Sequence, residues 1–377
     1  MPSGNRILLC AAGGGKTSRV VDQALANTQG KVALITYTRN NVGEIQAKIH
    51  SRVRAVPADV EILSWYTFLL RELARPFRSA LHNRRIDGIC WTEERSARYV
   101  AQSNTDAHYF INGRHIYQDK IAKFICACDK VSDGAIMNRL RDRFAQVIID
   151  EVQDMAGYDL DLLELMLRSG IALTLVGDHR QATFATNNAV KNKAFAGPAI
   201  VGKFEQWEKR KLATIVRERH THRCNQAIAD LSDTLFPAEP ATISKNEVLT
   251  GHDGIFLVAS PHVQAYTEMF SPQVLRYSAS TKFAGLEAMN FGQSKGLTFD
   301  RVLIFPHKAA ASWLKTGDVA HVAKTLAKMY VGVTRARFSV GFVFDPKACA
   351  IAATRWSPPE KDPSPTGVSE VTMPIDG

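Results

Sequence analysis

The feature that most constrains the fold is a glycine-rich turn near the N-terminus, in the segment Leu9–Arg19 with the sequence LCAAGGGKTSR. A short apolar run precedes it and an amphipathic stretch follows it. Glycines let the backbone curl until successive N–H groups point at one anion, and the start of the next helix adds a favourable dipole. The pattern predicts a phosphate-binding loop formed by Gly13, Gly14, Gly15, Lys16 and Thr17.

The side chains at the end of this loop suit a nucleoside triphosphate. Lys16 would reach the β and γ phosphates, and the hydroxyl of Thr17 would ligate magnesium. The strict form of the loop has glycine where this chain has Cys10. A plain glycine turn without a ligand is therefore the alternative for this segment alone.

An acidic pair after a buried strand favours the nucleotide interpretation. Phe144–Met155 has the sequence FAQVIIDEVQDM, in which an apolar strand ends at Asp150 and Glu151. Nucleotide sites in parallel sheets lie at the carboxyl ends of strands. We predict that Asp150 holds Mg²⁺ and that Glu151 positions and deprotonates an attacking water. The alternative is a solvated acidic turn.

The two segments GKT and DEVQD resemble the superfamily 1 DNA helicases of the UvrD/Rep/PcrA type. Further motifs similar to that family follow in the family's order: TYTR at 36–39, SWYTF at 64–68, VGDHRQ at 176–181, THRC at 221–224, SKGLTFD at 294–300 and YVGVTRA at 330–336. The resemblance implies two RecA-like P-loop NTPase domains, ATP and Mg²⁺ as cofactors, and 3′-to-5′ translocation on single-stranded DNA.

Alternating apolar strands and helical stretches predict an α/β fold with parallel sheets that carry helices on both faces. A basic, mostly helical segment interrupts the first set, and a proline-rich stretch ends the chain. We predict a first RecA-like domain at 1–69 and 144–212, an inserted helical subdomain at 70–143, a second RecA-like domain at 213–356 and a disordered tail at 357–377.

The resemblance also implies roles for residues of both domains around the nucleotide. Gln181 would sense the γ-phosphate, and Gly296 would contact the nucleotide. Arg223 and Arg335 would come from the second domain and stabilise the charge of phosphoryl transfer, as arginine fingers do. The alternative for either arginine is an ordinary surface position.

A second group of residues corresponds to the family's single-strand track. Such tracks combine backbone charge with aromatic faces on which bases stack. The resemblance implies that stacking comes from Tyr37, Trp65 and Phe184, and that phosphate contacts come from Thr36, Thr38, Arg39 and Ser64. Tyr37 and Trp65 have a competing interpretation as core aromatic residues.

The chain departs from the family at several positions. His222 replaces a tyrosine near the base, Thr298 replaces a glutamate, and no adenine-reading glutamine segment precedes the first strand. We therefore expect a relaxed nucleotide preference. The segment ATFATNN at 182–188 puts Thr186 and Asn187 where the family has an aromatic residue and an arginine. The interval 225–293 is too short for the family's large second-domain insertion.

Net charge, cysteine content and the length of the apolar runs limit the classes of function that this chain can have. The net charge of +10 over 377 residues favours a polyanionic partner, and no apolar run is long enough for a membrane span. The 6 scattered cysteines indicate reduced thiols, so we expect a cytoplasmic protein. Two functions remain: a motor acting on single-stranded or tailed DNA, or a DNA-stimulated sensor subunit working with a nuclease or another protein. A P-loop ATPase or kinase without nucleic acid is a third, disfavoured by SKGLTFD and YVGVTRAR.

Overall fold

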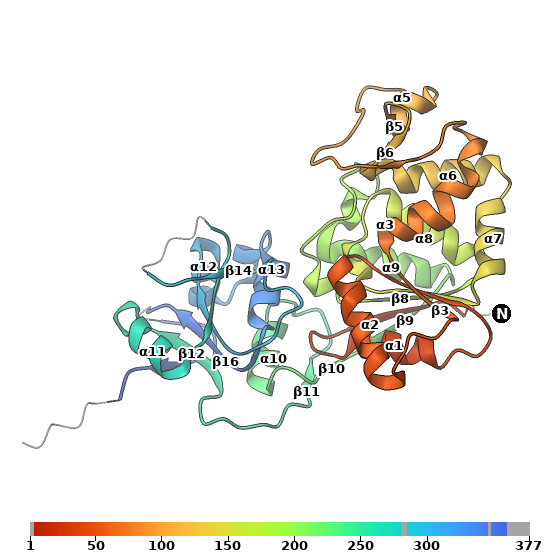
Figure 1. Ribbon diagram of the computed structural model, residues 1–377. Helices are drawn as coiled ribbons and strands as arrows, with labels where there is room; N and C mark the ends of the chain where they lie inside the picture. The colour runs from red at the N-terminus through yellow and green to blue at the C-terminus, as the bar shows by residue number, and fades with distance from the viewer. Residues whose placement is uncertain (1–3, 280–284, 346–347, 360–377) are drawn as a thin grey trace, which may run out of the picture.

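The computed structural model describes residues 4–279, 285–345 and 348–359. Two α/β domains lie side by side, and a smaller lobe stands on the first of them (Figure 1). The predicted disordered tail falls on 357–377, of which 360–377 lie outside the described residues. Within the described residues, no helix has the length and apolarity needed to cross a membrane.

The first domain is built on a six-stranded sheet in which every pairing is parallel. Its strands, in spatial order, are β3 (Val60–Ser64), β2 (Val32–Thr36), β7 (Gln146–Ile149), β8 (Ala172–Gly177), β1 (Arg6–Cys10) and β9 (Thr214–Glu218). The edge strand β9 pairs with β1 from residue 214 onward, beyond the predicted domain boundary at 212. That stretch is mostly exposed and charged, so its sequence lacks the apolar run of a buried strand.

Helices cover both faces of this sheet, and successive strand residues serve opposite faces. Leu34 of β2 packs in the core cluster beneath α1 (Lys16–Leu25) and α2 (Arg39–Val53). Its neighbour Ile35 packs in the larger cluster on the other face, with residues of α8 (Tyr158–Arg168) and α9 (Ile200–Lys209). Burial on both faces explains why the strands are almost continuously apolar.

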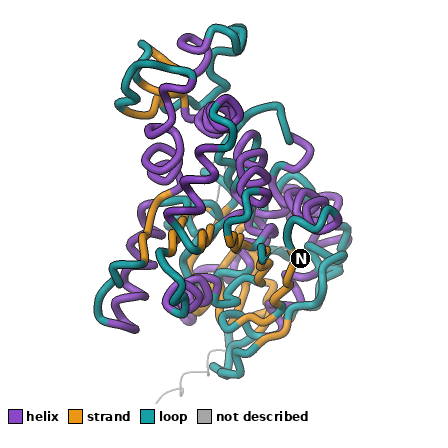
Figure 2. The backbone as a smooth tube through the Cα atoms, turned by 90° about the vertical axis from the view of Figure 1, so that its right-hand side faces the viewer, coloured by secondary structure: helices purple, strands orange, loops and turns teal. Residues whose placement is uncertain are grey.

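The inserted lobe is less helical than predicted, and it is not a separate core. Its strands form a three-stranded sheet of β4 (Gly88–Cys90), β6 (His115–Tyr117) and β5 (Phe110–Ile111). Helical segments precede, interrupt and follow these strands along the chain. They are α3 (Trp65–Phe68), a π-helical turn at Leu69–Ala74, α4 (Arg75–Phe77), α5 (Thr105–Tyr109), α6 (Ile121–Val131) and α7 (Ala135–Arg143). Figure 2 shows this lobe standing on the helical layer of the first domain. Its apolar residues belong to the same core cluster as those of the first sheet, so the lobe and the first domain share one hydrophobic core.

The second domain repeats the design with another six-stranded parallel sheet. Its strands, in spatial order, are β14 (Met289–Asn290), β13 (Gln273–Arg276), β15 (Phe299–Phe305), β16 (Ala336–Val343), β12 (Gly254–Val258) and β17 (Thr354–Trp356). Its helices are α10 (Gln226–Asp233), α11 (Val263–Phe270), α12 (Lys308–Thr316) and α13 (Leu326–Val333). The short strands β10 (His220–Thr221) and β11 (Ile243–Ser244) pair at the boundary between the domains.

Candidate nucleotide and nucleic-acid site

The glycine-rich turn joins β1 to α1, as the sequence predicts. Gly13 and Gly15 have φ of 73° and 75°, the left-handed region that favours glycine. A Cβ added to Gly13 would lie 2.5 Å from the Cβ of Arg223 in the second domain. Glycine at this position therefore allows the loop to approach the other domain closely.

A cleft of about 720 Å³ lies between the loop and the second domain. It is lined by all of the predicted nucleotide residues: Gly13, Gly14, Gly15, Lys16, Thr17, Asp150, Glu151, Gln181, Arg223, Gly296 and Arg335. Positions scattered over more than three hundred residues of sequence thus meet at one place, because the carboxyl ends of parallel strands share one edge of a sheet.

The acidic pair lies at the end of β7. The backbone N–H of Glu151 donates to the Asp150 carboxylate at 2.9 Å. Burial and the neighbouring charge of Glu151 raise the pKa of Asp150 to about 7. Burial also acts to raise the pKa of Glu151, but the charges of Lys295 and Lys16 outweigh it and lower that pKa. A divalent cation would relieve the repulsion between these carboxylates, and the oxygen ligands of Asp150 and Thr17 are those that Mg²⁺ prefers.

A lysine that was not among the predicted site residues completes this side of the cleft. Nζ of Lys295 donates to the carboxylate of Asp154 at 2.7 Å and lies 3.8 Å from Oε2 of Glu151. Lys295 belongs to the SKGLTFD motif, so the family resemblance could have pointed to it as a site residue. The ammonium group connects the second domain to the acidic segment of the first.

The two predicted arginines line the cleft from the second domain; Arg335 is buried and Arg223 is half-buried. Arg335, with 1% of its surface exposed, donates to the backbone oxygens of Val331 and Leu297 at 3.0 and 3.1 Å. Arg223 donates to the oxygen of Thr334 at 3.0 Å. No ion pair with a carboxylate forms at either guanidinium within the described part of the chain. Burial and the charge of Arg223 lower the pKa of Arg335 to about 9, which is the signature of a cation lacking a counter-charge.

Gln181 connects the two domains within the cleft. Its Nε2 donates to Asp178 at 2.8 Å, and its Oε1 accepts from Nη2 of Arg335 at 3.3 Å. The side chain at the predicted γ-phosphate-sensing position therefore contacts a predicted arginine finger directly.

The predicted DNA residues divide into two groups. Tyr37, Thr38 and Phe184 line the rim of the same cleft, and Phe184 is 51% exposed with Nζ of Lys295 5.4 Å from its ring centroid. Tyr37 is half-buried, and its ring lies 6.0 Å from that of Tyr66. Both aromatic side chains therefore border the cleft.

The stacking role predicted for Trp65 is wrong, because this side chain is fully buried beside Phe68 in the core. Thr36 is also fully buried, and its hydroxyl accepts from the amide of Asn41, so this side chain is closed to phosphates. The hydroxyl of Ser64 accepts from the N–H of Thr67 and caps α3. The Arg39 side chain lies outside the described part of the structure.

The divergent segment after Gln181 is held in place by its polar residues. Thr186 accepts through its hydroxyl from the N–H of Ala156 at 3.0 Å, and Asn187 donates to the oxygen of Asp119 at 2.9 Å. Both are buried. Phe184 is left as the one aromatic side chain of this segment at the rim.

Comparison with known families agrees with this geometry. Residues 93–195, which include the acidic pair and the VGDHRQ segment, match the UvrD/REP helicase N-terminal domain family. The match is to this part of the chain. The same cleft is also lined by residues outside the matched range, namely 13–17, 37–38, 222–223, 295–298 and Arg335.

The chain is also similar to individual proteins. It is 26% identical over 109 residues to the RecBCD enzyme subunit RecB of Borreliella burgdorferi, a match covering 27% of this chain and 9% of the relative. Similar solved structures are the Arterivirus nonstructural protein 10 helicase, alone (14% identity, TM-score 0.47, 91% of this chain and 60% of that one) and in complex with DNA (14%, 0.48, 91% and 61%). The chain thus spans less than two thirds of the length of these proteins.

Proposed function

We propose that this UvrD-like protein hydrolyses ATP between its two domains and uses the cycle to translocate along single-stranded DNA in the 3′-to-5′ direction, unwinding duplex ahead of it. The observation that carries the proposal is the placement of Arg223 and Arg335. A buried and a half-buried cation, neither with a carboxylate partner among the described residues, stand opposite a phosphate-binding loop and provide a site for the anionic end of a triphosphate. A structural role alone gives no reason to place two unpaired charges there.

Six side chains of the cleft would share the steps of this reaction. Lys16 and the loop N–H groups would bind the β and γ phosphates, and Thr17 with Asp150 would hold Mg²⁺, which supplies charge neutralisation when bound. Glu151, ionised because of the nearby lysines, would orient a water and accept its proton. Arg223 and Arg335 would stabilise the charge that spreads over the transferred phosphoryl group.

The DNA part of the proposal depends on the rim of the cleft. Tyr37 and Phe184 present aromatic faces at the rim, next to the N-terminus of α2, where Thr38 caps the helix. Stacking on these rings tolerates any base, and the chain's net charge of +10 favours the phosphate backbone. Opening and closing of the cleft would then move the strand relative to one domain.

A second candidate function follows from the segment after Gln181. Thr186 and Asn187 are structural residues there, so the rim has fewer ring faces than the family pattern implies. The alternative is a DNA-stimulated ATPase that unwinds little and acts as a sensor subunit, in the cytoplasm, with a nuclease or another protein as in phage defence.

The deciding experiment measures ATP hydrolysis with and without single-stranded DNA, together with strand displacement from a tailed duplex. We expect DNA to stimulate hydrolysis in the wild type, and Lys16→Ala to abolish it. The matched control is Lys31→Ala, which removes an exposed lysine outside the cleft. Stimulated hydrolysis with strand displacement supports the motor, and stimulated hydrolysis without it supports the sensor. Hydrolysis that ignores DNA would contradict both.

A further inference from the structure

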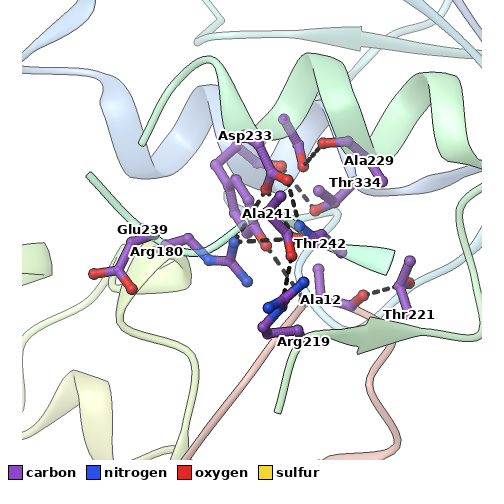
Figure 3. Close-up of polar contacts among 12 residues, drawn as sticks. Ala12, Arg180, Arg219, Thr221, Ala229, Asp233, Glu239, Ala241, Thr242 and Thr334 are labelled. Atoms are coloured by element: carbon purple, nitrogen blue, oxygen red, sulfur yellow. Dashed lines mark hydrogen bonds and ion pairs between the residues drawn. The ribbon is translucent and has the colours of Figure 1, made fainter. Parts of the chain in front are cut away.

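A buried arginine next to the γ-phosphate-sensing position contacts both domains. Arg180 is 6% exposed, and its Nε donates to Oδ1 of Asp178 at 3.1 Å within the first domain. Its Nη1 lies 3.4 Å from Oδ1 of Asp233 and 3.4 Å from the hydroxyl of Thr242, both in the second domain. Figure 3 shows the guanidinium of Arg180 directed toward Asp233, the last residue of α10, and Thr242, which directly precedes β11.

The domain-two end of this contact is itself held firmly. Asp233 accepts from the hydroxyl of Thr242 at 2.8 Å and from its backbone N–H at 2.5 Å. These bonds connect the end of α10 to the loop that precedes β11. The guanidinium also lies 4.8 Å from the ring centroid of Tyr330 on α13. The hydroxyl of Tyr330 accepts from the N–H of Ala12, at the start of the phosphate-binding loop.

The contacts of Arg180 continue into the nucleotide cleft through a shared carboxylate. Asp178 accepts from Arg180 on Oδ1 and from Gln181 on Oδ2. Gln181 in turn accepts from Arg335. A continuous series of polar contacts therefore runs from Asp233 on α10, through Arg180, Asp178 and Gln181 of the first domain, to Arg335 just after α13. Both ends of this series lie in the second domain.

We propose that Arg180 is a positioning residue that couples the approach of the second domain to the placement of Gln181 and Arg335 on the γ-phosphate. This inference rests on the proposed ATPase function. When the domains close, Asp233 and Tyr330 fix the guanidinium, which fixes the Asp178 carboxylate. Gln181 then has one defined partner on each side and cannot rotate away from Arg335.

The chemistry of the contacts requires a charged, forked side chain. The Nε and Nη1 groups of Arg180 reach carboxylates of different domains at the same time, which a single ammonium cannot do with the same geometry. A neutral isostere would leave the Asp178 carboxylate, which is 1% exposed, without its nearest cation. Gln181 would then be held by a carboxylate free to reorient.

The test uses the full chain with three substitutions at the network and one matched control. We expect Arg180→Met and Asp233→Asn each to lower the DNA-stimulated kcat by roughly tenfold while the KM for ATP stays within about twofold of wild type, because coupling between domains has this magnitude. Arg180→Lys should restore part of kcat. The control is Arg217→Met, a more exposed arginine at the same boundary whose carboxylate contacts are 3.6 and 3.8 Å.

A second measurement follows closure without hydrolysis. Small-angle scattering with Mg²⁺ and a non-hydrolysable ATP analogue should show compaction of the wild type and of Arg217→Met, and less compaction of Arg180→Met and Asp233→Asn. Wild-type kcat and compaction in Asp233→Asn would overturn the inference, and this variant carries the test if Arg180→Met fails to fold. A wild type that compacts with the analogue but never hydrolyses ATP would remove the proposed function and leave the coupling role standing.

Discussion

Lys295 of the second domain and Asp154 of the first are joined by a hydrogen bond of 2.7 Å between Nζ and Oδ2. Both side chains are largely buried, with 14% and 3% of their surfaces exposed. Burial raises the pKa of Asp154 to about 6 even though the lysine acts to lower it. The pair therefore joins the two domains at the point where the acidic segment after β7 ends.

Replacing this lysine should loosen the domain interface. Lys295→Met leaves a buried carboxylate without its donor, which costs about 1–3 kcal/mol. We expect a lower thermal unfolding midpoint in the absence of nucleotide. The control is Lys324→Met, an exposed lysine of the same domain. Equal midpoints for Lys295→Met and wild type would show that the pair contributes nothing to stability.

Substitutions of the two carboxylates of the acidic pair should affect different steps, one hydrolysis and the other nucleotide binding. Glu151→Gln should bind Mg²⁺ and ATP and lower kcat by roughly 10²- to 10⁴-fold, the contribution of a positioned general base. Asp150→Asn should instead weaken Mg²⁺-dependent nucleotide binding. Fluorescent-nucleotide titration and steady-state hydrolysis measure both effects. If Glu151→Gln loses binding while Asp150→Asn retains it, the roles are reversed.

The rim aromatics should contribute to DNA affinity, whereas the core aromatic should contribute to stability. Tyr37→Ala and Phe184→Ala should each weaken single-strand binding by about 1–3 kcal/mol if a base stacks on the ring. Trp65→Ala should lower the free energy of unfolding by about 3–5 kcal/mol, the cost of emptying a core site. Anisotropy across a salt series and thermal unfolding separate the two effects. Rim variants that bind DNA as tightly as wild type would exclude these rings from the track.

Stability should fall in mild acid because of a histidine in the second domain. His252 is stacked between Phe256 and Phe270, with ring centroids 3.9 and 3.6 Å away, and its Nε2 contacts the hydroxyl of Tyr266 at 2.9 Å. Burial, together with the charge of Arg301, lowers the pKa of His252 to about 4.

The folded state therefore binds fewer protons than the unfolded state between the ordinary histidine pKa of about 6.5 and about 4. Its contribution to stability is full above pH 6.5 and is lost as the pH falls toward 4. Unfolding midpoints of wild type and His252→Phe across this range should diverge, with the wild type falling more steeply. Parallel curves would contradict the assignment.

The sequence alone determined the parallel α/β class of both domains and the residues that gather at the cleft, because both depend on local chemistry. Continuous apolar runs such as β2 have to be buried on both faces, and a glycine run before Lys16 has few uses besides a phosphate loop. The side chains that lie at strand ends, including Asp150 and Gln181, then meet at the cleft by the geometry of parallel sheets.

Only the tertiary structure decided which aromatic residues are exposed and which charges are paired. Trp65 and Tyr37 occupy comparable positions just after strands, yet Trp65 is fully buried in the core cluster of the first domain and Tyr37 lines the cleft. Arg180 and Lys295 lie within motifs that the sequence shows, but the motifs do not indicate that their partners Asp233 and Asp154 belong to the opposite domain. Burial and pairing across an interface depend on residues far away in the chain, which no local pattern records.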